Sequence, residues 1–563
     1  MKKSISILLA GVVLSGAAVG FAGCDMLGGS GVDIDETKTQ LYVGNYEGGA
    51  GSAWLDDVII RFEEEYADYQ LNGKTGVQII NDTSKDNSGK SLGSSLNASP
   101  NEVFFTQQVL YHDYVAQGLV RDITSLVKKQ NPNDGNKSIE SKFEDADKTN
   151  LAVNGKYYMI PHYELYNGLT YDAYMFESEK LYFADDMDTD GTRKFIINAN
   201  TKKSCGPDGI YNTYDDGLPS SYQEFYKMAD KAKKAGYAIM WSGEQVHYTQ
   251  MLPSALYANY LGADALNINY NFNSKGKEVE VVTGFTGDTP NIEKVVISEE
   301  NNNQHLMYQA AGLYYGLEAA GKLFSDSSYY MPKSAGPTYT YTDAQEGFLE
   351  AGVAPKTKYV AMFIEGSYWY NEAKDSGALA RVEKYPTFAT KKLPRFMALP
   401  QQYEGTVKEG EGSSPVLVDS YSSFAFIKST IAPEKVELAE AFLAFCYTDQ
   451  ELVNFTRNTD GVVRGLKYDF SSVVGELSGF GKSVLEMRAA AKAGNSVVKD
   501  FSSHSLYIQH KANFTLDTAY EWLSSPKNKD AHFWTAVSKY NRSAKDYFMG
   551  MWLTEAEWNK KFK

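Results

Sequence analysis

The sequence contains little cysteine, little histidine and a deficit of positive charge. Its 563 residues include 3 Cys and 7 His, and its formal net charge is −16. Three cysteines are too few for a disulfide framework. The excess of negative charge argues against nucleic acid, and against an anionic membrane face, as the main partner. None of the histidines forms a His-Glu-x-x-His motif, so the sequence gives no support to a zinc protease.

Two cysteines, Cys205 and Cys446, lie in the body of the chain. They either form one disulfide or remain as two separate thiols. Free cysteine is among the most buried residue types, so we favour buried thiols. Beyond residue 22 no stretch reaches 18 consecutive apolar residues, and this part of the chain is therefore expected to be soluble.

The longest apolar stretch is at the N-terminus. Lys2 and Lys3 precede an uncharged apolar stretch over residues 5–22, and a small residue at position 23 leads into Cys24. A basic start, an apolar segment and small residues at its end are typical of a secretory signal peptide. A cysteine directly after the cleavage site resembles the lipobox of bacterial lipoproteins, in which that thiol receives a diacylglyceryl group.

This resemblance implies that residues 1–23 are a lipoprotein signal peptide. Lipidated Cys24, carrying acyl chains such as palmitate, would then anchor the protein at the extracellular face of the bacterial cell membrane. Acyl chains contribute about 0.8 kcal/mol per buried methylene, so two or three chains hold a protein firmly. A simple transmembrane anchor is the alternative, because the apolar stretch is nearly long enough to span a bilayer. Residues 24–37 are rich in glycine and acidic residues and are expected to form a flexible tether.

The rest of the chain predicts an α/β protein with more than one lobe. It is far longer than the roughly 250–300 residues at which a single hydrophobic core stops growing. Residues 40–43, 77–80 and 102–106 are apolar runs typical of strands, and residues 55–66 carry apolar side chains at helical spacing. Alternating strands and helices indicate a largely parallel sheet. A glycine-rich turn over residues 44–51 follows the first strand, where open α/β sheets bind ligands.

Several separate segments resemble, in the same order, those of bacterial extracellular solute-binding proteins of family 1, which serve ABC sugar importers. One of them, residues 361–369, reads Ala-Met-Phe-Ile-Glu-Gly-Ser-Tyr-Trp and is similar to the family's A-M-x-I-x-G-x-W pattern. The other segments that carry the resemblance are residues 101–124, 158–171, 217–225 and 439–461. Each is weak alone, and their order along the chain gives them weight together.

The resemblance implies a two-lobe periplasmic-binding-protein-like (type 2) fold, with a hinge and an interlobe cleft. By analogy, residues 38–162 and 343–411 are expected to form the first lobe. Residues 163–342 and 412–563 are expected to form the second. Several chain crossings between lobes would restrict their relative motion to bending about a hinge.

Sugar sites combine aromatic rings, which stack on the C–H faces of a sugar, with amides and carboxylates that bond its hydroxyls. The sequence has 41 Tyr, and several turns place an aromatic residue beside a polar one. Trp369 is the main candidate for stacking, and Trp241 is the next. The predicted ligand-binding residues are Asn45, Tyr46, Glu47, Tyr163, Glu164, Asn167, Trp241, Ser242, Glu365, Tyr368, Trp369 and Tyr421.

An acidic loop forms a second candidate site. Asp186, Asp188 and Asp190 alternate along the chain and Gly191 follows, as at the start of a calcium-binding loop. Position 197, where such a loop needs Glu, is Ile. Any missing ligand would come from Asp208, Asp215 or Asp216, and the alternative is a solvated acidic turn. A structural calcium ion is therefore the one cofactor considered, and it would brace the lobe rather than take part in chemistry.

These features predict a lipid-anchored extracellular receptor that captures a carbohydrate, such as an oligosaccharide, and delivers it to the permease subunits of an ABC importer. We expect a binding protein rather than an enzyme. Two alternatives remain open. The length of the chain would suit an oligopeptide receptor, and its many carboxylates could supply the catalytic pair of a secreted glycoside hydrolase.

Overall fold

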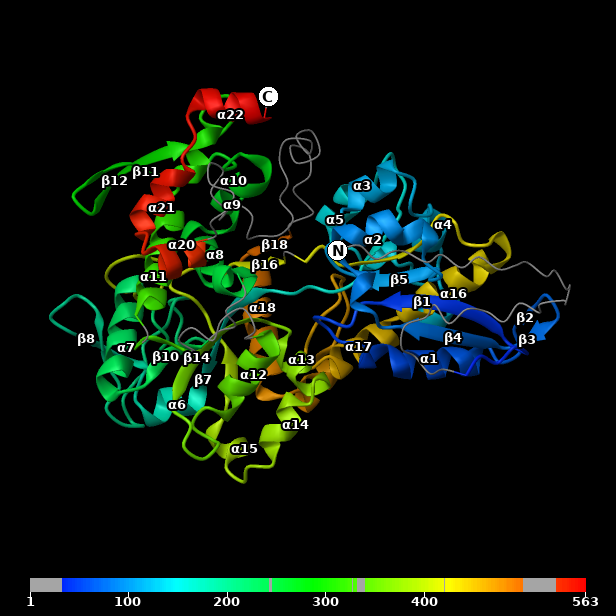
Figure 1. Ribbon diagram of the computed structural model, residues 1–563, viewed down its shortest axis with the longest axis horizontal. Coiled ribbons are helices and arrows are strands. Elements are labelled where there is room, and N and C mark those ends of the chain that lie inside the picture. Colours follow the sequence, from blue (N-terminus) through cyan, green and yellow to red (C-terminus); the bar gives the residue numbers. More distant parts are fainter. Residues whose placement is uncertain are drawn as a thin grey trace, which may run out of the picture.

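Two five-stranded sheets organise the chain into two lobes that lie side by side (Figure 1). This computed structural model describes residues 33–241, 246–326, 328–331, 340–419, 421–499 and 533–562. The predicted signal peptide, Cys24 and most of the tether lie outside these residues. None of the helices within them is long and apolar enough to cross a membrane.

The first sheet confirms the predicted α/β start of the chain. The central strand β1 pairs in parallel with β4 and with β5, and β17 pairs antiparallel with both β5 and β6. The strands, in sheet order, are β4 (Val77–Asp82), β1 (Thr39–Asn45), β5 (Val103–Thr106), β17 (Phe424–Ile427) and β6 (Ile160–Pro161). The three strands predicted over residues 40–43, 77–80 and 102–106 are thus adjacent.

Helices from both ends of the sequence cover this sheet. Helix α1 buries Trp54, Leu55 and Phe62, and the Phe62 ring lies 4.9 Å from that of Phe442 in α16. The helices of the first lobe are α1 (Ala53–Glu65), α2 (Gly89–Ser95), α3 (Tyr111–Ala116), α4 (Thr124–Lys128), α5 (Asp145–Asn150), α16 (Val436–Cys446) and α17 (Asp449–Asn458). Figure 1 shows α16 and α17 in yellow beside the blue strands and α1.

The second sheet is built from the middle of the sequence. Strand β14 pairs in parallel with β10 and antiparallel with β7. The strands, in sheet order, are β13 (Tyr330–Met331), β10 (Ala238–Trp241), β14 (Val360–Gly366), β7 (Asn167–Asp172) and β15 (Pro394–Phe396). All seven residues of β14 are buried, as expected of a central strand with both faces covered.

The pairing corrects the predicted lobe boundaries. Residues 343–411 were assigned to the first lobe, but they contain β14 and β15, which pair within the second sheet. Conversely, residues 421–458 were predicted to belong to the second lobe, but they contain β17, α16 and α17 of the first lobe. Strand pairing is a long-range property, so local sequence patterns did not reveal this exchange.

The second lobe is predominantly helical around its sheet. Helix α7 starts at the predicted segment 217–225, where the Ser221 hydroxyl accepts a hydrogen bond from the Glu224 N–H. The larger helices of this lobe are α6 (Ala173–Ser178), α7 (Tyr222–Ala235), α8 (Val246–Leu261), α11 (Ala311–Ser325), α12 (Tyr341–Glu350), α13 (Trp369–Asp375), α14 (Ala378–Glu383), α18 (Gly479–Ala493), α20 (Phe533–Tyr540), α21 (Ala544–Met551) and α22 (Glu555–Phe562).

Short elements complete this lobe. They are α9 (Ala263–Leu266), α10 (Ile268–Asn271), α15 (Phe388–Lys391), and the hairpins β8 (Phe183–Met187) with β9 (Arg193–Phe195) and β11 (Glu278–Thr286) with β12 (Thr289–Val296). The C-terminal helix α22 packs its Trp558 ring 4.9 Å from that of Phe272. The end of the chain is therefore part of the second core.

The described chain passes between the lobes near residues 162–167, 419–423 and 460–478. At the crossings, β16 (Leu417–Asp419) pairs in parallel with β18 (Val497–Lys499). Isolated bridges join Glu164 to Val463 and Tyr166 to Asp419. These bridges tie the crossing segments to one another, which is the arrangement expected of a hinge.

Candidate functional site

The predicted glycine-rich turn of the first lobe docks onto helix α13 of the second. The Gly49 N–H donates to Glu372 Oε1 at 2.9 Å, and Asn371 Nδ2 donates to the Ala50 carbonyl at 2.5 Å. Gly51 has a φ of +75°, and a Cβ at this position would lie 2.1 Å from Asp375 Oδ2. Glycine is therefore needed here for both conformation and close approach.

Predicted tyrosines meet beside this turn. The hydroxyls of Tyr368 and Tyr421 lie 2.7 Å apart, and Tyr421 also donates to Asn167 Oδ1 at 3.0 Å. The Tyr163 hydroxyl donates to Gln107 Oε1 at 2.8 Å. The structure thus brings Tyr163, Asn167, Tyr368 and Tyr421 to the boundary between the lobes, as the sequence predicted.

Two glutamates, one buried and one half-buried, lie next to these rings. Glu365 at the end of β14 is 1% exposed, and burial, followed by the charge of Glu372, raises its pKa well above the usual range. Burial also raises the pKa of Glu372 to about 7, against the opposing effect of the Gly49 N–H. Gln345 of α12 donates to Glu372 Oε2 at 3.0 Å. Glu365 was a predicted ligand residue, whereas Glu372 and Gln345 were not.

More tyrosines surround the glutamates. Burial, and then Glu372, raises the pKa of Tyr46, whereas burial, Glu365 and Glu372 raise that of Tyr248. The Tyr248 ring stacks on that of Tyr341, with centroids 5.8 Å apart. We call this assembly the interlobe site. It consists of Tyr46, Tyr163, Asn167, Tyr248, Gln345, Glu365, Tyr368, Glu372 and Tyr421.

Comparisons with solved structures recover proteins of this architecture. A chitin oligosaccharide binding protein aligns with 93% of this chain and 100% of its own, at 14% identity and a TM-score of 0.54. The apo-form of RafE from Streptococcus pneumoniae aligns with 94% of this chain and 100% of its own, at 12% identity and a TM-score of 0.53. RafE in complex with raffinose aligns with 93% of this chain and 100% of its own, at 12% identity and a TM-score of 0.53.

These similarities show the two-lobe α/β fold expected from the sequence. No family model and no curated protein matches the chain. At such low identity the solved structures support the fold alone, so the properties of the interlobe site are argued from its own residues.

Trp369, the main candidate for stacking, lies in the core instead. It is 0% exposed, and its rings lie within 5.2–5.9 Å of those of Phe363, Phe480 and Phe348. Its Nε1–H donates to Thr170 Oγ1 at 2.8 Å, which satisfies its polar group. The adjacent Tyr368 is the aromatic residue that reaches the interlobe site.

Glu164 was predicted to contact ligand, but it forms ion pairs at the hinge. Its Oε2 lies 2.8 Å from Arg488 Nε, and its Oε1 lies 3.5 Å from Lys499 Nζ. Burial alone would raise the pKa of Glu164, but Arg488 and Lys499 hold it well below the usual range. Lys499 also lies 2.7 Å from Asp147 of the first lobe, so it links the two lobes.

Asp419 shares this hinge, where Lys499 also acts on it. Burial, followed by the charge of Glu164, raises its pKa to about 8. Its Oδ1 accepts a long hydrogen bond, 3.4 Å, from the Leu165 N–H. The hinge therefore holds one ionised and one protonated carboxyl at neutral pH.

The remaining predicted residues are placed as follows. Asn45, at the end of β1, is 0% exposed, and neither atom of its side-chain amide has a hydrogen-bond partner. Glu47 is exposed. Trp241 is the last residue of β10, and Ser242 lies outside the described residues.

Sequence reasoning missed Tyr248, Gln345 and Glu372. Glu372 lies seven residues after Glu365, one helical turn inside α13. The position of Glu372, shortly after the Ile-Glu-Gly-Ser pattern, could have pointed to it from the sequence. Tyr248 and Gln345 lie in helices α8 and α12 far from any recognised pattern, and only tertiary structure brings them here.

The acidic loop contacts a lysine. Lys227 Nζ lies 2.8 Å from Asp188 Oδ2 and 3.2 Å from Asp190 Oδ2. Asp186 is exposed. Within the described residues, no group of three or more His, Cys, Asp or Glu side chains is arranged to hold a metal ion. The calcium site stays a prediction from the sequence, and in this structure a side-chain ammonium lies between two of its proposed ligands.

Both body cysteines are free thiols, as favoured from the sequence. Cys205 and Cys446 are buried, one in each lobe. Burial raises the pKa of both thiols, which disfavours the reactive thiolate.

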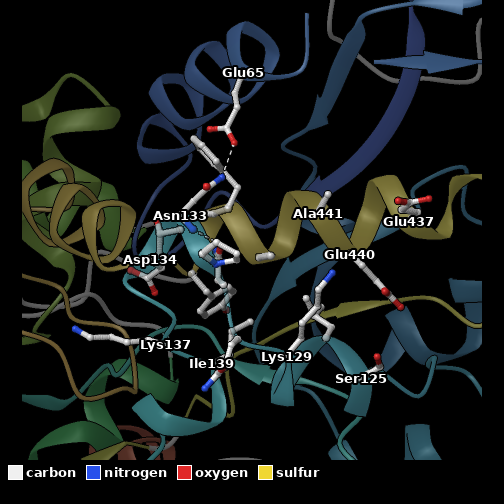
Figure 2. Close-up of a pocket in the computed structure, with 18 of the residues that line it drawn as sticks. Glu65, Ser125, Lys129, Asn133, Asp134, Lys137, Ile139, Glu437, Glu440 and Ala441 are labelled. Atoms are coloured by element: carbon white, nitrogen blue, oxygen red, sulfur yellow. Dashed lines mark hydrogen bonds between the residues drawn. The ribbon is translucent and has the colours of Figure 1, made fainter. Parts of the chain in front are cut away.

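A separate pocket of about 290 Å³ lies within the first lobe (Figure 2). It is bounded by the end of α1, the segment 125–139 and helix α16. Asn133 donates to Glu65 Oε1 at 3.2 Å across its rim, and Lys142 is bound to Asp134 at 2.6 Å. None of the predicted ligand residues lines this pocket.

Proposed function

We propose that the protein is a lipid-anchored extracellular receptor that binds an oligosaccharide between its lobes and delivers it to the permease subunits of an ABC importer. The observation that carries this proposal is the interlobe site, where tyrosine rings from both lobes adjoin amide and carboxyl groups of the second lobe. Such a set can stack on the faces of a sugar and bond its hydroxyls. The sugar ligands named for the similar solved structures agree with it.

The N-terminal pattern supports the proposed anchor and location. A tethered receptor at the extracellular face needs the signal peptide over residues 1–23 and lipidated Cys24. Metabolic labelling with an alkyne analogue of palmitate tests this directly. Label should enter the wild-type chain and be absent from Cys24→Ala, and label retained in that variant would overturn the anchor.

Ligand binding is tested on the full chain in detergent, by calorimetry and thermal shift. The probes are raffinose, chitin oligosaccharides, malto-oligosaccharides and a peptide library. We expect one sugar class to raise the melting temperature, and Tyr368→Ala and Tyr421→Ala to remove that effect. Tyr540→Ala is the matched control, because Tyr540 is 70% exposed. Binding of peptides but no sugar would contradict the proposal.

The same preparation separates binding from hydrolysis. A receptor should leave the bound oligosaccharide intact after prolonged incubation. Release of shorter sugars by the wild type, lost in Glu365→Gln, would instead identify a glycoside hydrolase.

A further inference from the structure

The interlobe site contains two carboxyl groups, those of buried Glu365 and half-buried Glu372. Within the described residues, neither Glu365 nor Glu372 forms an ion pair with Lys or Arg. Lys85 lowers the pKa of Glu372, but it is an exposed side chain whose Nζ donates to the Tyr341 hydroxyl at 3.1 Å. Buried carboxylates are normally paired, so this site has an excess of acid over base.

Among the residues that the structure describes, two buried acceptor atoms of this site have no hydrogen-bond partner. They are Glu365 Oε2 and Gln345 Oε1, on side chains that are 1% and 0% exposed. Gln345 Nε2 donates to Glu372, and the atom of this amide that lacks a partner is Oε1. The amide of Gln345 also acts on the pKa of Glu365, which places all three side chains together. Acceptors left unpaired in a protein interior call for a donor.

Aromatic rings lie close to the carboxyl pair. Tyr368 acts on Glu365 through a side-chain hydrogen bond, the charge of Glu365 acts on the Tyr248 phenol, and the charge of Glu372 acts on the Tyr46 phenol. The face of an aromatic ring attracts a cation. Acceptor atoms, two carboxyls that an adjacent cation would ionise, and aromatic rings therefore all favour the same kind of group, one with several N–H donors and a positive charge.

We propose that the interlobe site binds the protonated amino group of an amino sugar. Glu365 Oε2 and Gln345 Oε1 each accept an N–H from the ammonium, and Glu372 supplies the second negative charge. A hydroxyl of a neutral sugar has a single hydrogen to donate and would leave one acceptor unpaired. The neighbouring Asn167, Tyr163 and Tyr421 remain for the sugar hydroxyls. This inference rests on the proposed function and names its ligand class.

The test compares two ligands that differ only at the amino group. Glucosamine oligosaccharides and N-acetylglucosamine oligosaccharides of equal length are titrated into the full chain by calorimetry. We expect the free amines to bind at least about tenfold more tightly, because hydrogen bonds to charged groups are the stronger ones. In Glu365→Gln and Glu372→Gln this preference should disappear, and in the control Glu64→Gln, an exposed residue of α1, it should persist.

Each outcome has a distinct meaning. Equal affinity for the two ligands in the wild type overturns the amino-sugar inference and leaves the receptor proposal standing, and this comparison needs no variant. Binding of a free polyamine more tightly than any amino sugar also overturns it. Binding of neither sugar series nor of the wider panel contradicts the receptor proposal itself.

Discussion

The Tyr368 hydroxyl lies 2.7 Å from the Tyr421 hydroxyl, and this contact joins the two lobes through aromatic side chains. Tyr368 precedes helix α13 of the second lobe. Tyr421 lies in the crossing segment that leads into β17 of the first. Because Tyr421 also donates to Asn167, one hydroxyl connects three separate segments at the interlobe site.

Removing the hydroxyl of Tyr421 should lower both the stability of the protein and its affinity for ligand. Tyr421→Phe keeps the ring and loses its hydrogen bonds, each of which contributes about 0.5–1.5 kcal/mol. We expect a lower free energy of unfolding in urea and a weaker affinity by calorimetry. Tyr540→Phe, at an exposed position, should change neither quantity. Unchanged affinity in Tyr421→Phe would exclude its hydroxyl from ligand binding.

Trp369→Ala should act on the core rather than on the ligand. Truncating a buried aromatic side chain costs about 3–5 kcal/mol. Urea unfolding should show this loss, and Trp369→Phe, which retains a ring, should show a smaller one. A variant that unfolds like the wild type but no longer binds ligand would show that Trp369 contacts the ligand.

Gly51→Ala should disturb the docking of the glycine-rich turn. The matched control is Gly73→Ala, because Gly73 has a φ of +80° and no atom within 4 Å of the added Cβ. Both variants carry the strain of a left-handed residue, about 1–2 kcal/mol. Only Gly51→Ala also meets Asp375, so it should lose more stability and more ligand affinity. Equal effects in the two variants would show that docking tolerates the added methyl group.

The hinge predicts a pH dependence centred on Asp419. Its pKa is about 4 in an unfolded chain and about 8 in the folded protein. The carboxyl therefore favours folding below pH 4, and this contribution declines as the pH rises and is lost above pH 8. The melting temperature of Asp419→Asn should rise relative to that of the wild type between about pH 4 and 8, and the difference should be constant above that range. Parallel profiles would contradict the raised pKa.

Chelation tests the acidic loop. Since Lys227 contacts Asp188 and Asp190, we expect EDTA to leave the melting temperature unchanged. Lys227→Met removes the ammonium, and added calcium should stabilise that variant more than the wild type, because a ligand stabilises only the state that binds it. A fall in the melting temperature of the wild type with EDTA, reversed by calcium, would establish the predicted calcium site.

Local patterns predicted much of the first lobe. Apolar runs located β1, β4 and β5, and helical spacing located α1, whose Leu55, Val58 and Phe62 are buried. These elements follow one another along the chain, so their arrangement needed little long-range information. The glycine-rich turn was also expected after the first strand, and it docks on helix α13.

The lobe boundaries and the stacking residue could not be obtained in this way. Whether β14 pairs with β7 or with β5 depends on partners nearly two hundred residues or more away, about which a local pattern carries no information. Trp369 and Tyr368 are adjacent at the start of a helix, so their side chains point about 100° apart, and the sequence does not say which of the two faces the other lobe. Trp369 was the favoured candidate for stacking on a sugar, whereas its packing against Phe363 and Phe480 buries it.

The position of β17 has a consequence for biosynthesis. This strand lies between β5 and β6, so the first sheet stays open until residues 424–427 have left the ribosome. By then every strand of the second sheet has already been made. The second sheet can therefore form before the first is complete, with β5 and β6 lacking their shared neighbour in the meantime.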